Sequence, residues 1–226
     1  MAGILSVALI TAGIVILADA GMTLAWKEPV SWVYGEINQR QAEGQLEDLE
    51  EEFAAVVDFE AVADAGSIDK QAQELARQFS RKVPDGEGIG RVKVPSVGID
   101  YVFVEGTDTE TLQRGPGRYP GTAFPGEGRT IGIAGHRTTY SAPFRRINDV
   151  EGGDEIIIEM PYGKFTYEVE KSEIVEPTDV QIVDDVGRER LVLTACHPLF
   201  SAAERFALFA DLASIELPGD PGVEPS

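Results

Sequence analysis

The chain has 226 residues, 43% of them hydrophobic, and a formal net charge of −20. This length and composition suit one domain with a hydrophobic core plus additional segments. A nucleic-acid-binding face needs clustered Lys and Arg, so the acidic balance argues against nucleic acid as a partner. The chain holds one Cys and two His. A single Cys excludes an intramolecular disulfide and a Cys-rich zinc site. No metal or other cofactor is expected.

The N-terminus carries an uncharged, strongly apolar run over residues 2–18, interrupted by Asp19. Its length favours a helix that spans a bilayer, which needs about 20 apolar residues. The aromatic residues that follow are of the types that settle at membrane interfaces, namely Trp26, Trp32 and Tyr34. We predict a transmembrane signal-anchor region over residues 1–35, with a signal peptide cleaved near residues 18–20 as the alternative.

Residues 36–83 are acidic and rich in helix-favouring types. Apolar residues recur there at spacings of three and four and predict one apolar stripe on a charged helix, at Leu46, Leu49, Phe53 and Val56. Residues 64–69 interrupt this helix, and Leu75 with Phe79 indicates a second, short one. We expect a stalk or a helix packed on the domain, in preference to a helix that binds a partner.

Turn-forming residues at 84–88 mark a boundary, after which short apolar runs alternate with clusters of Gly, Pro and Asp. This pattern predicts a mostly antiparallel sheet or barrel over residues 84–217. Short helices are predicted at 109–113 and 143–148, and the Pro- and Gly-rich tail at 218–226 is predicted to be disordered. The predicted strands are 89–94, 99–105, 130–135, 155–160, 165–175, 190–196 and 206–215.

The single cysteine, Cys196, follows the apolar run at 191–193, which is typical of an interior strand. A lone Cys is often just a small buried hydrophobe. At the end of a strand, however, a thiol can reach a surface groove while the sheet fixes its position. Adjacent side chains on a strand point to opposite faces, so His197 should face away from Cys196. The partner base is therefore expected at His136, which also ends an apolar strand.

These stretches resemble the sortases, the membrane-anchored cysteine transpeptidases of Gram-positive bacteria. Residues 193–196, Leu-Thr-Ala-Cys, resemble the family's TLxTC signature, although Ala195 stands where threonine is usual and no threonine begins the motif. His136 matches the histidine of an AGHR motif, and Arg205 matches the arginine that follows the cysteine. The residues around 115–122 and after the cysteine look most like class E, which is common in actinobacteria.

The resemblance implies an eight-stranded sortase β-barrel, outside the cell, on a single-pass membrane anchor. It also implies that the Cys196 thiolate attacks a backbone carbonyl of a sorting signal and forms a thioester. Arg205 would stabilise the oxyanion or hold the peptide, and His136 would protonate the departing amine and deprotonate the incoming one. The cut would fall between Thr and Gly of a C-terminal Leu-Ala-x-Thr-Gly or Leu-Pro-x-Thr-Gly signal on a secreted protein. The acceptor would be an amine of a cell-wall precursor or a pilin lysine.

Four further residues are expected to contact the substrate. Tyr119 matches a tyrosine tied to the preference for Leu-Ala-x-Thr-Gly, with ordinary packing of an aromatic ring as the alternative. Thr194, Ala195 and His197 flank the thiol. Two other functions stay open: a cysteine hydrolase that releases its product to water, and a membrane-anchored binding module with a degenerate site.

The net charge of −20 leads to one expectation about the chemistry. A strongly negative protein disfavours the thiolate of Cys196 and favours the imidazolium of His136, unless Arg205 offsets the field locally. We therefore expect a minor thiolate fraction at neutral pH and slow turnover.

Overall fold

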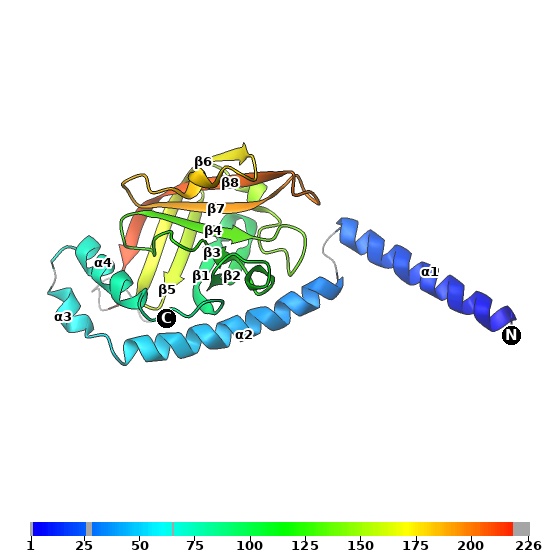
Figure 1. The fold of residues 1–226 in the computed structure, drawn as a ribbon, viewed down its shortest axis with the longest axis horizontal. Helices are drawn as coiled ribbons and strands as arrows, with labels where there is room; N and C mark the ends of the chain where they lie inside the picture. Colours follow the sequence, from blue (N-terminus) through cyan, green and yellow to red (C-terminus); the bar gives the residue numbers. More distant parts are fainter. Residues whose placement is uncertain (1, 26–28, 65, 219–226) are drawn as a thin grey trace.

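The computed structural model describes residues 2–25, 29–64 and 66–218. Three sequence predictions lie outside the described part: the interfacial positions of Trp26 and of the Trp32 side chain, and the disordered tail beyond Pro218. Within the described residues, eight strands close into a barrel, with helices before the first strand (Figure 1). The prediction of a mostly β, eight-stranded barrel is confirmed.

The first helix, α1 (Ala2–Ala25), is long and apolar enough to cross a membrane. Its segment Gly3–Gly21 has a mean hydropathy of 2.2 and is not buried by any other described part of the chain. Figure 1 shows α1 projecting away from the barrel, beyond the N-terminal end of α2 (Pro29–Ala54). An apolar helix with no protein to cover it is compatible with a single-pass membrane anchor.

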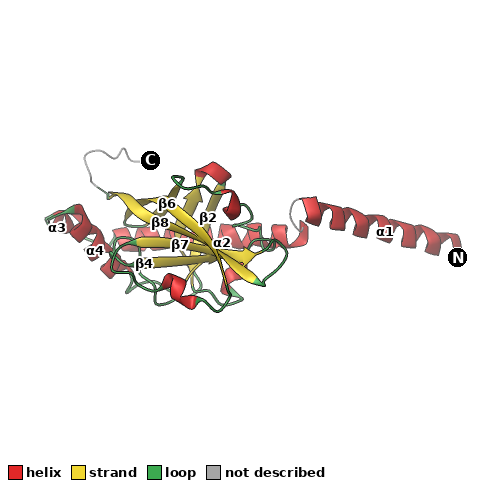
Figure 2. Ribbon diagram, turned by 90° about the horizontal axis from the view of Figure 1, so that it is seen from above, coloured by secondary structure: helices red, strands yellow, loops and turns green. Residues whose placement is uncertain are grey.

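The long helix α2 lies along the barrel, against β1 and β2 (Figure 1). Viewed from above, β6, β7 and β8 lie in front and α2 passes behind the barrel (Figure 2). The predicted apolar stripe is buried at Leu46, Leu49 and Phe53. The prediction for the last member of the stripe, Val56, is wrong. The helix α2 ends at Ala54, so the helical spacing stops there. Val56 is 58% exposed, and Val57 is buried instead.

Two short helices follow and close one end of the barrel. They are α3 (Phe59–Ala63) and α4 (Ile68–Phe79). Leu75 and Phe79 of α4 are fully buried, and the Phe79 ring packs against Phe53 with ring centroids 5.4 Å apart. The predicted second helix therefore exists, and its apolar face joins the main core.

The barrel strands follow the order β1-β2-β3-β4-β7-β8-β6-β5 around the closed sheet. Most neighbours are antiparallel, but β2–β3 and β4–β7 are parallel. Three predicted strands match in both bounds, and four are longer by one to three residues. The strands are β1 (Gly88–Val94), β2 (Ile99–Glu105), β3 (Gly117–Arg118), β4 (Thr130–Gly135), β5 (Glu155–Met160), β6 (Gly163–Val175), β7 (Arg190–His197) and β8 (Glu204–Glu216).

Short 3-10 helices lie between the strands. They are η1 (Pro95–Val97), η2 (Thr111–Gln113), η3 (Ile147–Asp149) and η4 (Val180–Val183). The helix predicted at 109–113 is reduced to η2. The one predicted at 143–148 is largely wrong, because the chain from residue 138 onwards forms turns that pack Phe144 into the core, and only η3 is helical.

The two faces of β7 have different roles. Leu191, Leu193 and Ala195 point into the barrel and belong to its main core. Val192 points outward into a small cluster with Ala207 of β8, which η4 covers. Alternation along the strand then places Cys196 on the outer face, where the sheet supports it without burying it.

Candidate functional site

Strand register brings the three predicted catalytic residues together. In the parallel pair β4–β7, Gly135 is level with Ala195, so the next residues, His136 and Cys196, also lie level. On the other side of β7, Cys196 is paired directly with Arg205 of β8. Residues paired across adjacent strands project to the same face of a sheet. The thiol, the imidazole and the guanidinium therefore arise side by side on the outer face.

A pocket of roughly 210 Å³ opens at this point. Cys196, His136 and Arg205 all line it, at the ends of three neighbouring strands. The remaining lining residues come from β4 and β7, from the segment between β2 and β3, and from the loop after β3, namely Thr107, Leu112, Tyr119, Ala134, Gly135, Thr194 and Ala195. The thiol is therefore reachable from a small pocket with both apolar and polar lining residues.

His136 and Cys196 are both half-buried, and the imidazole lies against a neighbouring ring. Its ring centroid lies 5.0 Å from that of Tyr140, at an interplanar angle of 47°. Nε2 is buried and has no hydrogen-bond partner among the described residues. Burial lowers the pKa of His136, because desolvation penalises the imidazolium. The expectation that the acidic protein favours the imidazolium is therefore wrong at this ring, where desolvation shifts the pKa downward.

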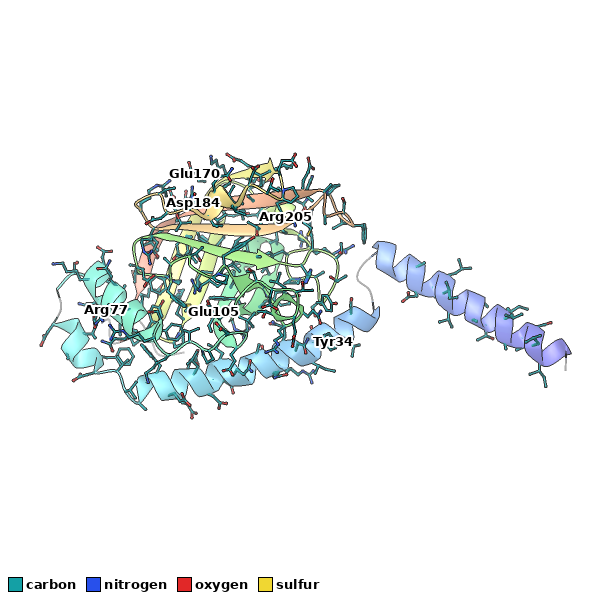
Figure 3. All side chains as sticks on the ribbon, viewed as in Figure 1. Tyr34, Arg77, Glu105, Glu170, Asp184 and Arg205 are labelled. Atoms are coloured by element: carbon teal, nitrogen blue, oxygen red, sulfur yellow. The ribbon has the colours of Figure 1, made fainter. Side chains whose placement is uncertain are left out.

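Arg205 is held by the backbone of the loop between β7 and β8. Its Nη1 donates to the carbonyl of Ala202 at 3.1 Å and to that of Glu204 at 3.0 Å. Figure 3 labels Arg205 in the half of the barrel nearer to α1. No carboxylate pairs with this guanidinium within the described residues, so no ion pair neutralises its charge where it lines the pocket.

The four predicted substrate contacts are placed differently. The Tyr119 hydroxyl and the Thr194 Oγ1 are 2.8 Å apart and hydrogen-bonded at the pocket wall. Ala195 lines the pocket, although its side chain is buried in the barrel core. His197 is not part of the lining; as the alternation predicted, it faces away from Cys196, with its Nδ1 3.1 Å from Nη1 of Arg137.

Arg137 is not among the site residues predicted from the sequence. It is only 6% exposed, and its Nη1 donates to the carbonyl of Cys196 at 3.3 Å. Its Nη2 donates to the side chain of Asn148. Burial lowers the pKa of this guanidinium. Its position directly after His136 was the available signal, because an arginine there can reach across to the neighbouring strand that carries the thiol.

Comparison with known proteins assigns the family. A profile described as a sortase domain matches residues 92–213, more than half of the chain. The chain belongs to the sortase family. Sortase D of Bacillus subtilis is 32% identical over 150 residues, which cover 65% of this chain and 74% of the relative. A sortase is a transpeptidase, so this barrel is the scaffold of an enzyme.

Solved sortase structures share this barrel. Sortase E from Streptomyces avermitilis is 30% identical, with a TM-score of 0.55, and the match covers 62% of this chain and 97% of that one. The Clostridium perfringens sortase D5 transpeptidase aligns over 77% of this chain and 99% of its own, with a TM-score of 0.61 and 24% identity. Relatives of both the D and the E type thus resemble this sortase.

Proposed function

We propose that Cys196, His136 and Arg205 carry out acyl transfer by this sortase. The observation that supports the proposal best is their common position: three residues distant in sequence line one pocket on the outer face of β4, β7 and β8. Thiol, imidazole and guanidinium are the groups that nucleophilic acyl transfer needs for attack, proton transfer and charge stabilisation.

In the first step, His136 takes the proton of the Cys196 thiol, the sulfur forms a bond to the carbonyl carbon of the signal's Thr, and the bond from that carbon to the Gly nitrogen breaks. His136 gives the thiol's proton to the departing amine. In the second step, an amine attacks the thioester, His136 takes its proton, and the Cys196 thiolate leaves and takes the proton back from His136. Arg205 stabilises the negative charge that develops on the carbonyl oxygen in both steps.

The substrate is a secreted protein with a C-terminal sorting signal of the Leu-Ala-x-Thr-Gly or Leu-Pro-x-Thr-Gly type. We place this sortase nearest class E, and we assign Tyr119 to the preference for Ala in the signal, because its hydroxyl borders the pocket beside Thr194. Thr194 and Ala195 contact the bound peptide, and His197 contributes from behind the strand through Arg137. The acceptor is an amine of a cell-wall precursor or a pilin lysine.

The proposal also covers the placement of the enzyme. Residues 1–35 anchor it in the cell membrane by a single pass, residues 36–83 form the connecting helical segment, and residues 84–217 form the catalytic barrel outside the cell. The exposed apolar helix α1 supports this division. A catalytic domain outside the membrane meets secreted proteins and cell-wall amines directly.

The test uses the full chain in detergent with synthetic peptides that contain Leu-Ala-x-Thr-Gly or Leu-Pro-x-Thr-Gly. Intact-mass spectrometry should find an acyl adduct on Cys196, and added glycine amines should convert it to the amide product. Cys196→Ala should give no adduct. Release of the free acid alone, with added amine never incorporated, would identify a hydrolase and overturn the transpeptidase proposal.

A further inference from the structure

The N-terminal end of α2 reaches the loop that follows His136. The ring of Tyr34, on α2, lies against Tyr140 with centroids 6.1 Å apart and an interplanar angle of 61°. The Tyr140 ring in turn lies against that of His136, with centroids 5.0 Å apart in a tilted arrangement. Figure 3 labels Tyr34 near the N-terminal end of α2, in the half of the barrel nearer to α1 where Arg205 also lies. Three rings thus connect this helix to the imidazole in the pocket.

The loop has an unusual backbone at this contact. Tyr140, Ser141 and Ala142 have φ angles of 50°, 62° and 47°, all in the left-handed region. Non-glycine residues adopt this region rarely, and a run of three persists only when its surroundings fix it. Two hydrogen bonds contribute: Ala142 N–H donates to the Thr139 carbonyl at 2.8 Å, and the Tyr101 hydroxyl donates to the Ser141 carbonyl at 3.3 Å.

The third support is α2 itself, which meets the loop at Gly35. A Cβ added to Gly35 would lie 2.3 Å from Ser141 Oγ, 2.7 Å from Ser141 N and 2.7 Å from the carbonyl carbon of Tyr140. Two of these atoms are backbone, so the clash could not be relieved by a side-chain rotation. The helix and the loop can approach this closely only because residue 35 has no side chain.

We propose that the N-terminal end of α2 is a positioning element of the active site: through Gly35 and Tyr34 it holds the 138–142 loop in its left-handed form and Tyr140 against His136. This inference rests on the proposed role of His136 in acyl transfer. As a consequence, α2, which follows the membrane anchor in the chain, and the imidazole of His136, which transfers the proton, are held in a fixed relative position.

The groups around His136 determine the direction in which its pKa should shift when the loop is released. Cys196 and Tyr119 face the ring's pocket from β7 and from the loop after β3, and Arg205 faces it from β8. Tyr140 covers the ring, and Tyr34 covers Tyr140. Desolvation is the cause that lowers the pKa of His136. Release of the loop admits water, so the pKa of His136 should rise toward its ordinary value.

The experiment compares Gly35→Ala with Gly44→Ala in the full chain. Both changes replace glycine by alanine in the same helix, but a Cβ at Gly44 meets nothing within 4 Å. The chain has only two histidines, so NMR can follow the imidazole of His136 through a pH titration, with His197→Asn for assignment. Acylation by the Leu-Ala-x-Thr-Gly peptide is measured in parallel under single-turnover conditions.

We expect Gly35→Ala to raise the pKa of His136 and to slow acylation about tenfold at unchanged peptide affinity, because small displacements of a reacting group are costly. Gly44→Ala should match the unchanged protein. Tyr34→Ala removes only a half-exposed ring, so it should fold and give a smaller shift in the same direction.

Unchanged titration and acylation in Gly35→Ala and Tyr34→Ala together would overturn the inference. If Gly35→Ala does not fold, Tyr34→Ala decides by the same criterion. A chain that is never acylated, yet shows the shift of His136 in both variants, would refute the proposed function while supporting the contact between α2 and the imidazole.

Discussion

Replacing Arg137 by Ala tests whether the buried guanidinium holds the strand end that carries Cys196. The side chain bridges the carbonyl of Cys196, at 3.3 Å, and Nδ1 of His197, at 3.1 Å, and it also binds Asn148. Hydrogen bonds to a charged group contribute about 1.5–3 kcal/mol each, and the variant is relieved of the cost of burying the charge. We expect a net loss of about 2–4 kcal/mol, which lowers the melting temperature of a chain of this size by roughly 5–15 °C.

Differential scanning calorimetry of the full chain in detergent measures the stability, and single-turnover acylation measures the effect on Cys196. We expect acylation to fall by about 10–100-fold, because the main chain at the thiol loses its support. Arg146→Ala is the matched control: this arginine lies in the same loop, is exposed, and pairs with Asp149 at 3.0 Å, so its loss should cost less than about 1 kcal/mol. Equal stability and equal acylation in the two variants would refute the reasoning.

Three further variants test neighbouring features. Tyr119→Phe removes the 2.8 Å hydrogen bond to Thr194 and should lower the free energy of unfolding by about 1 kcal/mol. It should also reduce the preference for Leu-Ala over Leu-Pro peptides in competition assays. An unchanged preference would exclude the assigned role. His136→Asn should reduce the loss of stability that urea titrations detect as the pH falls below about 6.5, because the lowered pKa of His136 makes the unfolded chain bind the proton first. Glu105→Gln breaks the buried 2.6 Å ion pair with Arg118 and should cost about 3–5 kcal/mol, again by urea titration; a loss below 1 kcal/mol would contradict this.

Alternation and turn residues made most of the barrel predictable. The strands β2, β4 and β5 have the predicted bounds because each is an apolar run enclosed by Gly, Pro or Asp. The orientation of His197 away from Cys196 followed from alternation alone, and the structure agrees. Patterns of period two within one strand are local, so they can be read without knowledge of the neighbours.

Features that depend on distant neighbours could not be predicted. The two-residue strand β3 exists because Gly117 and Arg118 pair with β2 and β4. Two residues are too few to show the alternating pattern that indicates a strand. The pKa of His136 is lowered by desolvation, and the packing that buries the ring, which includes the contact with Tyr140, is formed by the fold and not by neighbours in the sequence. The role of Arg137 also needs the register of β4 against β7, which the sequence does not contain.

The most direct test of the joint action of Cys196, His136 and Arg205 is single-turnover intact-mass spectrometry with Leu-Ala-x-Thr-Gly peptide. The unchanged chain should accumulate a thioester on Cys196, and Arg205→Ala should slow its formation by about 10²–10³-fold, as expected when a charged oxyanion donor is lost. His136→Asn should slow both the formation of the thioester and the transfer of the acyl group to an added amine, because His136 moves a proton in each step. An adduct on any residue other than Cys196, or acylation of Arg205→Ala at the rate of the unchanged chain, would contradict this account.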